Sequence, residues 1–529
     1  MNLVLRGGRV WAGKGLPAAT ALAIRDGRVA GVGGDEAVCR LAGNGTRVVD
    51  LRGRLVVPGF NDAHVHFLDG GFGLLSVDLR GARDVEELAG RLAAHARAVP
   101  RGAWIGQGNW DHEAWPSRAL PGRKDIDAAT PGHPVFVNRL DGHVALANSL
   151  AMSRAGITRD TPDPPGGAIG RDARGEPTGI LKDNAMDLVA RVIPAPSREE
   201  NKAAARAALR EAGRLGVTTI QDNSSVDALP TYQDLRAAGE LTARMCVWRP
   251  IAARSALEEA GVRTGLGDAW IRLGALKILA DGSFGAATAA LEAPYDDHPE
   301  TAGLLLYPEE ELREMIRAAD VAGFQLAVHA IGDRANRIVL DAFESAVRRH
   351  GPRDRRFRIE HAQMVSRADL ARYRALGVIA SVQPSHAIDD LRFAEARIGP
   401  KRARLAYNVR SFLDAGVPLA FGTDWYVEPL DPRLGLYAAV ARERPEGGPA
   451  GGWLPAEKIG LEEALDVYTR GSAFAEFGEG EKGTLEVGKL GDAAVFAADL
   501  LSRPPRDILE TPVDMTVVGG RVVFERERA

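Results

Sequence analysis

The chain has 529 residues, of which 45% are hydrophobic and 26% are charged, as is typical of a soluble globular enzyme with several domains or one elaborated barrel. Its formal net charge of −4 excludes the strongly basic character expected of a protein that binds nucleic acid. Two cysteines, Cys39 and Cys246, exclude a disulfide scaffold and a cysteine-rich zinc module.

Short strands are predicted at both ends of the chain. In the N-terminal part, apolar runs at residues 3–5, 21–24, 28–32 and 47–50 are bounded by Gly or Asp-Gly. Asp26-Gly27 between two of these runs is a strong hairpin signal. Similar runs occur at residues 493–496 and 515–524. We therefore expect one small β domain built from residues 1–57 and 476–529.

The middle of the chain alternates apolar runs with helical patterns. Helical patterns such as residues 309–322 and 367–376 precede most of the candidate strands. Repeated strand and helix units imply an α/β fold with a parallel sheet, and eight units suggest a closed (β/α)8 barrel over residues 58–475. The candidate strands are residues 55–60, 217–222, 244–249, 271–279, 325–330, 357–361, 377–383 and 417–423.

Residues 68–210 lie between the first two candidate strands and are too many for a loop, so they predict an inserted subdomain. Within it, residues 166–181 have the pattern of a β-hairpin. An insertion after the first barrel strand lies beside the C-terminal face, where barrel active sites are found. Trp110 and His143 are therefore candidate substrate contacts, and the core of the subdomain is the alternative place for Trp110.

Two histidines follow the first candidate strand. His64 and His66 come after the Pro58-Gly59 step, and residues two apart in a strand point to the same side. Two neutral imidazoles aimed at one point suit zinc or a neighbouring transition metal. The alternative is a pair of surface histidines after a turn.

Lys277 lies inside the apolar run of the fourth candidate strand. A buried lysine is costly unless its charge is paired or removed. Reaction of the amine with carbon dioxide would remove the charge and give a carbamate, whose oxygens can bridge two metal ions. The alternative is an ion pair with Asp281 or another acid.

Three later candidate strands also end in a potential metal ligand, namely His329, His361 and Asp424. Because the C-terminal ends of barrel strands meet at one face, these side chains are expected to come together. His386 follows the seventh candidate strand near the same face and is, like His143, a candidate substrate contact. Surface positions in helices or loops account for His95, His112, His133, His298 and His350.

The ordered motifs resemble those of the metal-dependent amidohydrolase superfamily, in its YtcJ-like branch (amidohydrolase family 3). The resemblance covers nearly the whole chain, including the insertion around Trp110, around His143 and at Glu176-Pro177-Thr178-Gly179. One departure is Gly285-Ala286-Ala287-Thr288-Ala289, where Ser-Arg is expected after the glycine, so the substrates of relatives do not transfer directly. The main motifs are Pro58-Gly59-Phe60-Asn61-Asp62-Ala63-His64-Val65-His66, Leu276-Lys277-Ile278-Leu279-Ala280-Asp281-Gly282-Ser283, Val328-His329-Ala330-Ile331-Gly332-Asp333, Ile359-Glu360-His361-Ala362-Gln363 and Gly422-Thr423-Asp424-Trp425.

The resemblance implies a TIM-like barrel, a β-sandwich formed by both termini, and a centre of one or two divalent ions, with zinc as the expected metal. One ion would be held by His64, His66 and Asp424 and the other by His329 and His361, with a carboxylated Lys277 between them. A metal ion lowers the pKa of bound water from ~15.7 towards ~7 and polarises a carbonyl group. Asp424, the only carboxylate in this set, can take a proton from the water and deliver it to the leaving amine.

The expected reaction is hydrolysis of a C–N bond in a small amide, N-substituted formamide or cyclic amide; an ester or carbamate substrate stays open. The alternatives are a metal-dependent deaminase or isomerase on the same scaffold, or a non-catalytic binding protein. No apolar run reaches the ~20 residues of a membrane span, and no signal peptide is evident, so we expect a cytoplasmic enzyme that has no membrane partner. A homo-oligomer stays open.

Overall fold

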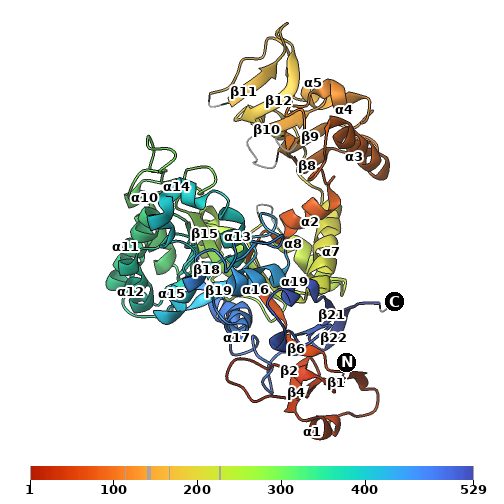
Figure 1. The fold of residues 1–529 in the computed structure, drawn as a ribbon, viewed down its shortest axis with the longest axis vertical. Helices are drawn as coiled ribbons and strands as arrows, with labels where there is room; N and C mark the ends of the chain where they lie inside the picture. The colour runs from red at the N-terminus through yellow and green to blue at the C-terminus, as the bar shows by residue number, and fades with distance from the viewer. Residues whose placement is uncertain (1, 113–114, 140–143, 166, 225–227, 528–529) are drawn as a thin grey trace. The chain divides into compact units, whose positions relative to one another are not determined.

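The computed structural model describes residues 2–112, 115–139, 144–165, 167–224 and 228–527 (Figure 1). The chain forms two compact units, one of residues 1–68 and 208–529 and the other of residues 69–207. Within the described residues, no helix combines the length and the apolar character that a membrane crossing requires.

The barrel of the first unit is an eight-stranded parallel sheet whose strands neighbour one another in chain order, which confirms the expected (β/α)8 class. It nearly closes between its first and last strands, since the Asp424 N–H donates to the His64 carbonyl at 2.7 Å and the Thr423 N–H to Asp62 Oδ1 at 3.0 Å. The strands are β7 (Phe60–Val65), β13 (Val217–Asp222), β14 (Arg244–Pro250), β15 (Ile271–Leu279), β16 (Leu326–Ala330), β17 (Arg358–His361), β18 (Ile379–Val382) and β19 (Leu419–Phe421).

Helices connect the barrel strands, and their ends carry recognisable caps. Helix α12 (Arg367–Leu376) begins where the Ser366 side chain accepts the Asp369 N–H, and it ends at Gly377, whose φ of 63° favours glycine. Helix α11 (Asp333–His350) buries one apolar face. The other helices from residue 198 onward are α7 (Arg198–Leu215), α8 (Leu229–Ala237), α9 (Arg254–Glu259), α10 (Glu309–Val321), α13 (Pro384–Asp390), α14 (Ala394–Ala403), α15 (Val409–Asp414), α16 (Pro432–Ala441), α17 (Leu461–Asp466), α18 (Ser472–Ala475) and α19 (Asp507–Glu510).

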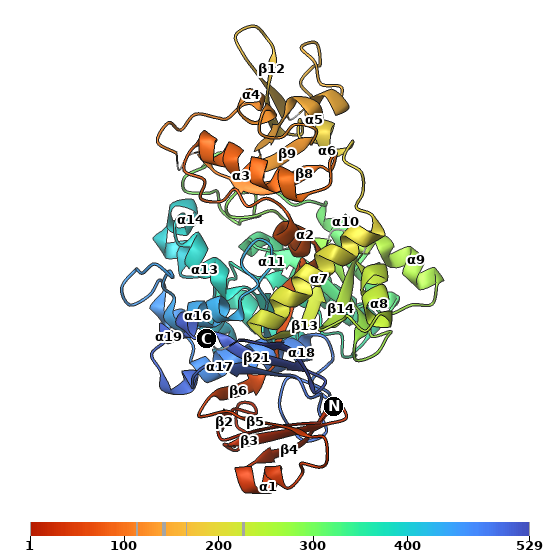
Figure 2. The ribbon, with the colours of Figure 1, turned by 90° about the vertical axis from the view of Figure 1, so that its right-hand side faces the viewer.

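Both ends of the chain form a β-sandwich, as expected (Figure 2). One sheet has the order β4-β3-β1-β5, and the other, β2-β6-β20-β21-β22, combines N-terminal and C-terminal strands. The two sheets share an apolar core that includes Leu5, Val56, Val495 and Val517. The strands are β1 (Leu3–Arg6), β2 (Arg9–Val10), β3 (Ala21–Arg25), β4 (Arg28–Gly33), β5 (Arg47–Asp50), β6 (Leu55–Pro58), β20 (Ala493–Phe496), β21 (Val513–Val518) and β22 (Arg521–Glu525), with helix α1 (Asp35–Cys39) after β4.

The first candidate strand, residues 55–60, is two strands in the structure, so this element of the prediction was wrong. Strand β6 belongs to the sandwich, whereas β7 begins at Phe60 and belongs to the barrel. Gly59 separates them, and a Cβ at this position would lie 2.2 Å from Thr218 Oγ1. Only glycine leaves room at this position for the buried Thr218 side chain.

The second unit contains a five-stranded sheet of order β11-β12-β10-β9-β8. Strands β11 and β12 pair antiparallel, which confirms the hairpin predicted at residues 166–181. A separate apolar core includes Leu88, Trp110, Trp115 and Val137. The elements are β8 (Ile105–Trp110), β9 (Val135–Arg139), β10 (Val144–Ala147), β11 (Gly167–Arg171), β12 (Pro177–Asp183), α3 (Val85–Ala98), α4 (Arg123–Asp127), α5 (Ser149–Arg154) and α6 (Asp187–Ala190), while α2 (Phe67–Leu75) runs from the first unit into this one.

Candidate metal centre

The ends of five barrel strands carry the residues singled out from the sequence. His64 is the fifth residue of β7, His361 is the last residue of β17, and Asp424 follows β19. Lys277 and His329 lie near the ends of the adjacent strands β15 and β16. Since all eight strands are parallel, these side chains belong to one end of the barrel.

Asp424 is the residue at which these side chains meet. Its Oδ1 atom lies 3.2 Å from His66 Nε2 and 3.5 Å from His64 Nε2. Its Oδ2 atom lies 3.8 Å from His386 Nε2 and 4.0 Å from His361 Nδ1. Two sets of candidate ligand atoms therefore share Asp424, one with His64 and His66 and the other with His361 and His386, and each set lies within 4.8 Å.

Lys277 and His329 complete the cluster from the adjacent strands. Lys277 Nζ lies 3.3 Å from His64 Nε2. The His329 ring centroid lies 4.5 Å from that of His361. The structure thus brings together all six ligands proposed from the sequence, and it adds His386 to the same cluster.

Acceptor groups behind the imidazoles orient three of these histidines. Glu360 Oε2 lies 2.7 Å from His64 Nδ1, Gln383 Oε1 lies 2.8 Å from His361 Nδ1, and the Gly282 carbonyl lies 2.9 Å from His329 Nε2. Each acceptor favours a proton on the nitrogen that it faces, so the other ring nitrogen keeps its lone pair. This arrangement is typical of histidines that bind a metal.

Burial keeps these imidazoles neutral. Burial, together with the nearby Lys277 ammonium, lowers the pKa of His64 to about 4 and that of His329 to about 4. Burial alone would raise the pKa of Asp424, but the facing His64, His66 and His361 hold it well below its usual range. Neutral imidazoles beside an ionised carboxylate form a donor set that suits zinc and related divalent ions.

Two buried polar atoms of the cluster lack a hydrogen bond. Among the described residues, Asp424 Oδ1 and His386 Nε2 are both buried and have no hydrogen-bond partner of acceptable geometry. A buried polar atom without a partner is costly, and a metal ion coordinated by Asp424 would remove this cost for its carboxylate. The residues present therefore fit a divalent metal.

Among the described residues, Asp281 forms no ion pair with Lys277, so it is not the acid of the alternative interpretation; Glu360 and Asp424, which both act on the lysine charge, leave a pairing with another acid open. The Asp281 carboxylate instead accepts the backbone N–H groups of Ala290, Ile331 and Gly332 at 2.9, 3.0 and 2.9 Å. These bonds tie the segment after β15 to the segment after β16. Burial of the carboxylate raises its pKa to about 7.

Glu360 and Gln383 contact the candidate ligands, and neither was singled out from the sequence. Their contacts with His64 and His361 depend on strand neighbours and on the barrel interior, which sequence spacing does not show. Glu360 did carry a signal, because an ionisable residue inside the buried run of β17 requires a partner.

The remaining sequence candidates have different outcomes. Trp110 is fully buried in the core of the insertion and donates its indole N–H to the Val137 carbonyl at 3.0 Å, which matches the alternative left open above. His143 lies outside the described residues.

His133 is buried rather than at the surface, with its Nδ1 atom 3.2 Å from the Ala103 carbonyl. His350 is also partly buried, with its Nδ1 atom 2.6 Å from Asp320 Oδ2.

The sequence profile of the amidohydrolase family matches residues 47–524, which include both the barrel and strands of the sandwich. The chain belongs to this family. The match extends over every proposed ligand of the metal centre. It agrees with the resemblance inferred from the motifs.

Three curated relatives of this amidohydrolase align along nearly its whole length. Protein LONG AFTER FAR-RED 3 of Arabidopsis thaliana is 37% identical and covers 96% of this chain and 89% of its own. The putative amidohydrolase YtcJ of Bacillus subtilis is 31% identical and covers 96% of both chains. The N-substituted formamide deformylase of Arthrobacter pascens is 29% identical and covers 96% of this chain and 95% of its own.

A solved structure shows the same fold. The amidohydrolase superimposes on an uncharacterized metal-dependent hydrolase from Pyrococcus furiosus with a TM-score of 0.80 and 31% identity. The alignment covers 95% of this chain and all of the other.

Proposed function

We propose that this amidohydrolase hydrolyses a C–N bond in a small amide, N-substituted formamide or cyclic amide with the help of one or two bound divalent ions, with zinc as the expected metal. The observation that carries the proposal is the Asp424 carboxylate, whose two oxygens face imidazoles on both sides at the end of the barrel. The Arthrobacter relative, by its name a deformylase of N-substituted formamides, supports this substrate class.

The proposed ligands divide into two groups around Asp424. His64, His66 and Asp424 would hold one ion, and His329 and His361 a second. A metal bound here supplies a Lewis acid that polarises the substrate carbonyl and makes water acidic enough to react near neutral pH.

Lys277 would bridge the two groups as a carbamate. Its Nζ atom would form a bond to the carbon of carbon dioxide and lose one proton to solvent, leaving an anionic ligand. Burial supports this step because it lowers the pKa of the amine to about 8, against the opposing effects of Glu360 and Asp424, so more of the reactive neutral form is present.

Asp424 would move the proton during the reaction. One carboxylate oxygen would accept the proton of the attacking water, and the same group would then deliver it to the leaving nitrogen. His386 would contact the substrate, because its buried Nε2 atom lies 3.8 Å from Asp424 Oδ2 while its Nδ1 atom lies 3.1 Å from Gln363 Nε2. If the Gln363 amide donates, His386 Nε2 carries the proton and can donate it in a hydrogen bond to a carbonyl oxygen.

The test is a substrate panel with zinc-loaded protein. It should contain N-substituted formamides, simple amides and cyclic amides, together with amino-substituted heterocycles as deaminase substrates. We expect release of an amine and a carboxylate from at least one member of the first three classes. Release of ammonia from heterocycles alone would favour the deaminase, and no turnover by fully loaded protein would favour a binding protein.

A further inference from the structure

A row of buried polar side chains runs through the barrel interior from His64 to the N-terminal end of β7. We propose that this row positions His64 for metal binding, and so sets metal affinity from residues that do not touch the metal; the inference rests on the proposed metal centre. We call it the interior row, and its members are Glu360, Arg358, Gln221, Asn61, Glu476 and Lys482. None of them is more than 5% exposed.

The row begins at the metal centre with Glu360. Its Oε2 atom lies 2.7 Å from His64 Nδ1, and its Oε1 atom accepts Arg358 Nε at 2.9 Å. Arg358 also donates to the Ala63 carbonyl at 2.7 Å and to Ser381 Oγ at 2.8 Å. The guanidinium therefore joins β7, β17 and β18, and it holds the carboxylate in place behind the imidazole.

An ionised carboxylate only accepts hydrogen bonds, so Glu360 requires a proton on His64 Nδ1 and leaves the lone pair on Nε2. That nitrogen is the one that faces Asp424 at 3.5 Å. The negative charge also makes the imidazole a stronger ligand. Because Glu360 and Arg358 are both fully buried, removal of either would leave an uncompensated charge.

Two amides carry the row onward from Arg358. Its Nη1 atom donates to Gln221 Oε1. Gln221 Nε2 donates to Asn61 Oδ1 at 3.0 Å, and Asn61 Nδ2 donates to Glu476 Oε1 at 2.7 Å. Arg358 can only donate and Glu476 can only accept, so the two charged ends fix the direction of both amides. Each amide makes these hydrogen bonds in only one orientation, so the orientation of one amide fixes that of the next.

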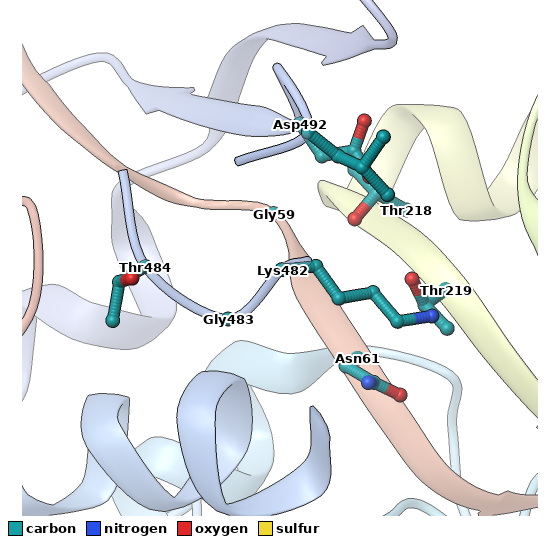
Figure 3. Close-up of a pocket in the computed structure, with 9 residues that line it drawn as sticks. Gly59, Asn61, Thr218, Thr219, Lys482, Gly483, Thr484 and Asp492 are labelled. Atoms are coloured by element: carbon teal, nitrogen blue, oxygen red, sulfur yellow. The ribbon is translucent and has the colours of Figure 1, made fainter. Parts of the chain in front are cut away.

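The far end of the row is closed to solvent. Lys482 Nζ lies 2.8 Å from Glu476 Oε1, and Figure 3 shows the Lys482 side chain extending from its loop toward Thr219 and Asn61. Lys482, Thr219 and Asn61 are among the residues that line a cavity of about 10 Å³, enough for the centre of one water molecule. The charged groups of the row therefore interact with other protein groups, and bulk water does not screen them.

The test compares zinc affinity in three variants, measured by competition with a chelator, with circular dichroism to follow folding. Glu360→Gln should weaken zinc binding by about 10–100-fold, the usual cost of losing a group that orients a metal ligand. Gln221→Leu breaks the row but keeps the buried charge pair next to His64, so it should weaken binding less. The matched control is Asp320→Asn, which breaks another buried ion pair, with Arg355 at 2.7 Å, outside the barrel interior.

The proposal predicts that Asp320→Asn lowers the melting temperature while zinc affinity stays at the wild-type value. Equal losses of affinity in Asp320→Asn and Glu360→Gln would show a general effect of destabilisation and would overturn the proposal. Wild-type zinc affinity in Gln221→Leu would show that the residues beyond Arg358 do not contribute, and it would overturn that part of the proposal. If Glu360→Gln does not fold, the zinc affinity of Gln221→Leu is the deciding measurement. Zinc binding by the wild type without turnover of any substrate would instead overturn the proposed function alone.

Discussion

Asp424 and His361 hold an unusual backbone conformation. Asp424 has φ of 58° and His361 has φ of 68°, in the left-handed region that residues other than glycine rarely occupy. Such conformations persist where the surrounding structure holds them, and they gather at functional sites. Here they occur where β17 and β19 end, and the two side chains lie 4.0 Å apart between His361 Nδ1 and Asp424 Oδ2.

Replacement of Asp424 by Asn tests the proton transfer. Asp424→Asn keeps the shape of the side chain but removes the basic oxygen, so we expect kcat to fall by about 10²–10⁴-fold. The fold and most of the metal should remain, because the other proposed ligands are intact. The measurement is kcat against zinc content on any substrate that the panel identifies. Near-normal turnover at full zinc occupancy would remove Asp424 from proton transfer, and rescue by excess zinc would leave it only a ligand.

A double replacement tests the division of the ligands into two groups. His329→Ala combined with His361→Ala should remove one of two zinc equivalents, because His64 and His66 can still hold the other. Metal content of the purified proteins is the measurement. His298→Ala serves as the control, since His298 is exposed and lies 3.1 Å from Glu300 Oε1 in a loop. Full zinc content in the double variant would contradict the assignment.

At the scale of elements, buried parallel strands were the easiest to predict. Strands β13 and β15 match the ranges predicted for them residue for residue, and nearly all of their residues are buried. The range predicted at residues 55–60 was wrong. Both strands on either side of Gly59 are buried, and the pattern does not show that they belong to different sheets.

The positions of the candidate metal ligands were predictable, whereas those of the groups that contact them from behind were not. His329 and Asp424 follow their apolar runs directly, so a barrel brings them to one rim. Glu360 and His64 belong to strands that are not neighbours in the sheet and are 296 residues apart in the chain. Their contact crosses the barrel interior, and it depends on closure of the sheet rather than on any local pattern.

Asp320 links helices α10 and α11 to the segment before β17. Its fully buried carboxylate lies 2.6 Å from His350 Nδ1, accepts Arg355 Nε at 2.7 Å and pairs with Arg353. Asp320→Asn should therefore cost about 3 kcal/mol of unfolding free energy, at the low end for a buried pair because Arg353 reaches solvent. Urea unfolding measures this cost, and Glu314→Gln on the exposed side of α10 should change nothing measurable.

The ion pairs of Asp320 also make the free energy of unfolding depend on pH. Burial raises the pKa of Asp320, but Arg355 and His350 lower it more, so its pKa in the folded protein is below the ordinary value. The carboxylate thus stabilises the fold at pH values above its unfolded pKa of ~3.9, and the contribution is lost as the pH falls through the folded pKa. The difference between wild type and Asp320→Asn should be constant above about pH 5 and shrink below about pH 4. A constant difference down to pH 3 would contradict this assignment.

At the scale of the whole molecule, the C-terminal strands complete a sheet begun at the N-terminus. Strand β21 is buried at every residue and lies between β20 and β22. Deletion of residues 513–529 should therefore abolish soluble, folded protein. Deletion of residues 521–529 removes only the edge strand β22, which is partly exposed, and should lower the melting temperature without preventing folding. Soluble yield and thermal melts measure both effects, and a normal melt of the longer deletion would contradict them.

The continuous passage from β6 through Gly59 into β7 has a consequence for synthesis on the ribosome. This segment, which includes His64, is made long before the strands with which it pairs. Its sandwich strand pairs with β20 (Ala493–Phe496), and its barrel strand meets the segment after β19 (Leu419–Phe421). Domains usually fold from the N-terminus as they emerge, but here the barrel cannot close before residue 421 has been made and the sandwich cannot close before residue 496 has been made. A nascent chain that stalls before residue 493 would expose the unpaired edge of β6, which can then pair with other chains. We therefore expect efficient production to require uninterrupted elongation or binding by chaperones.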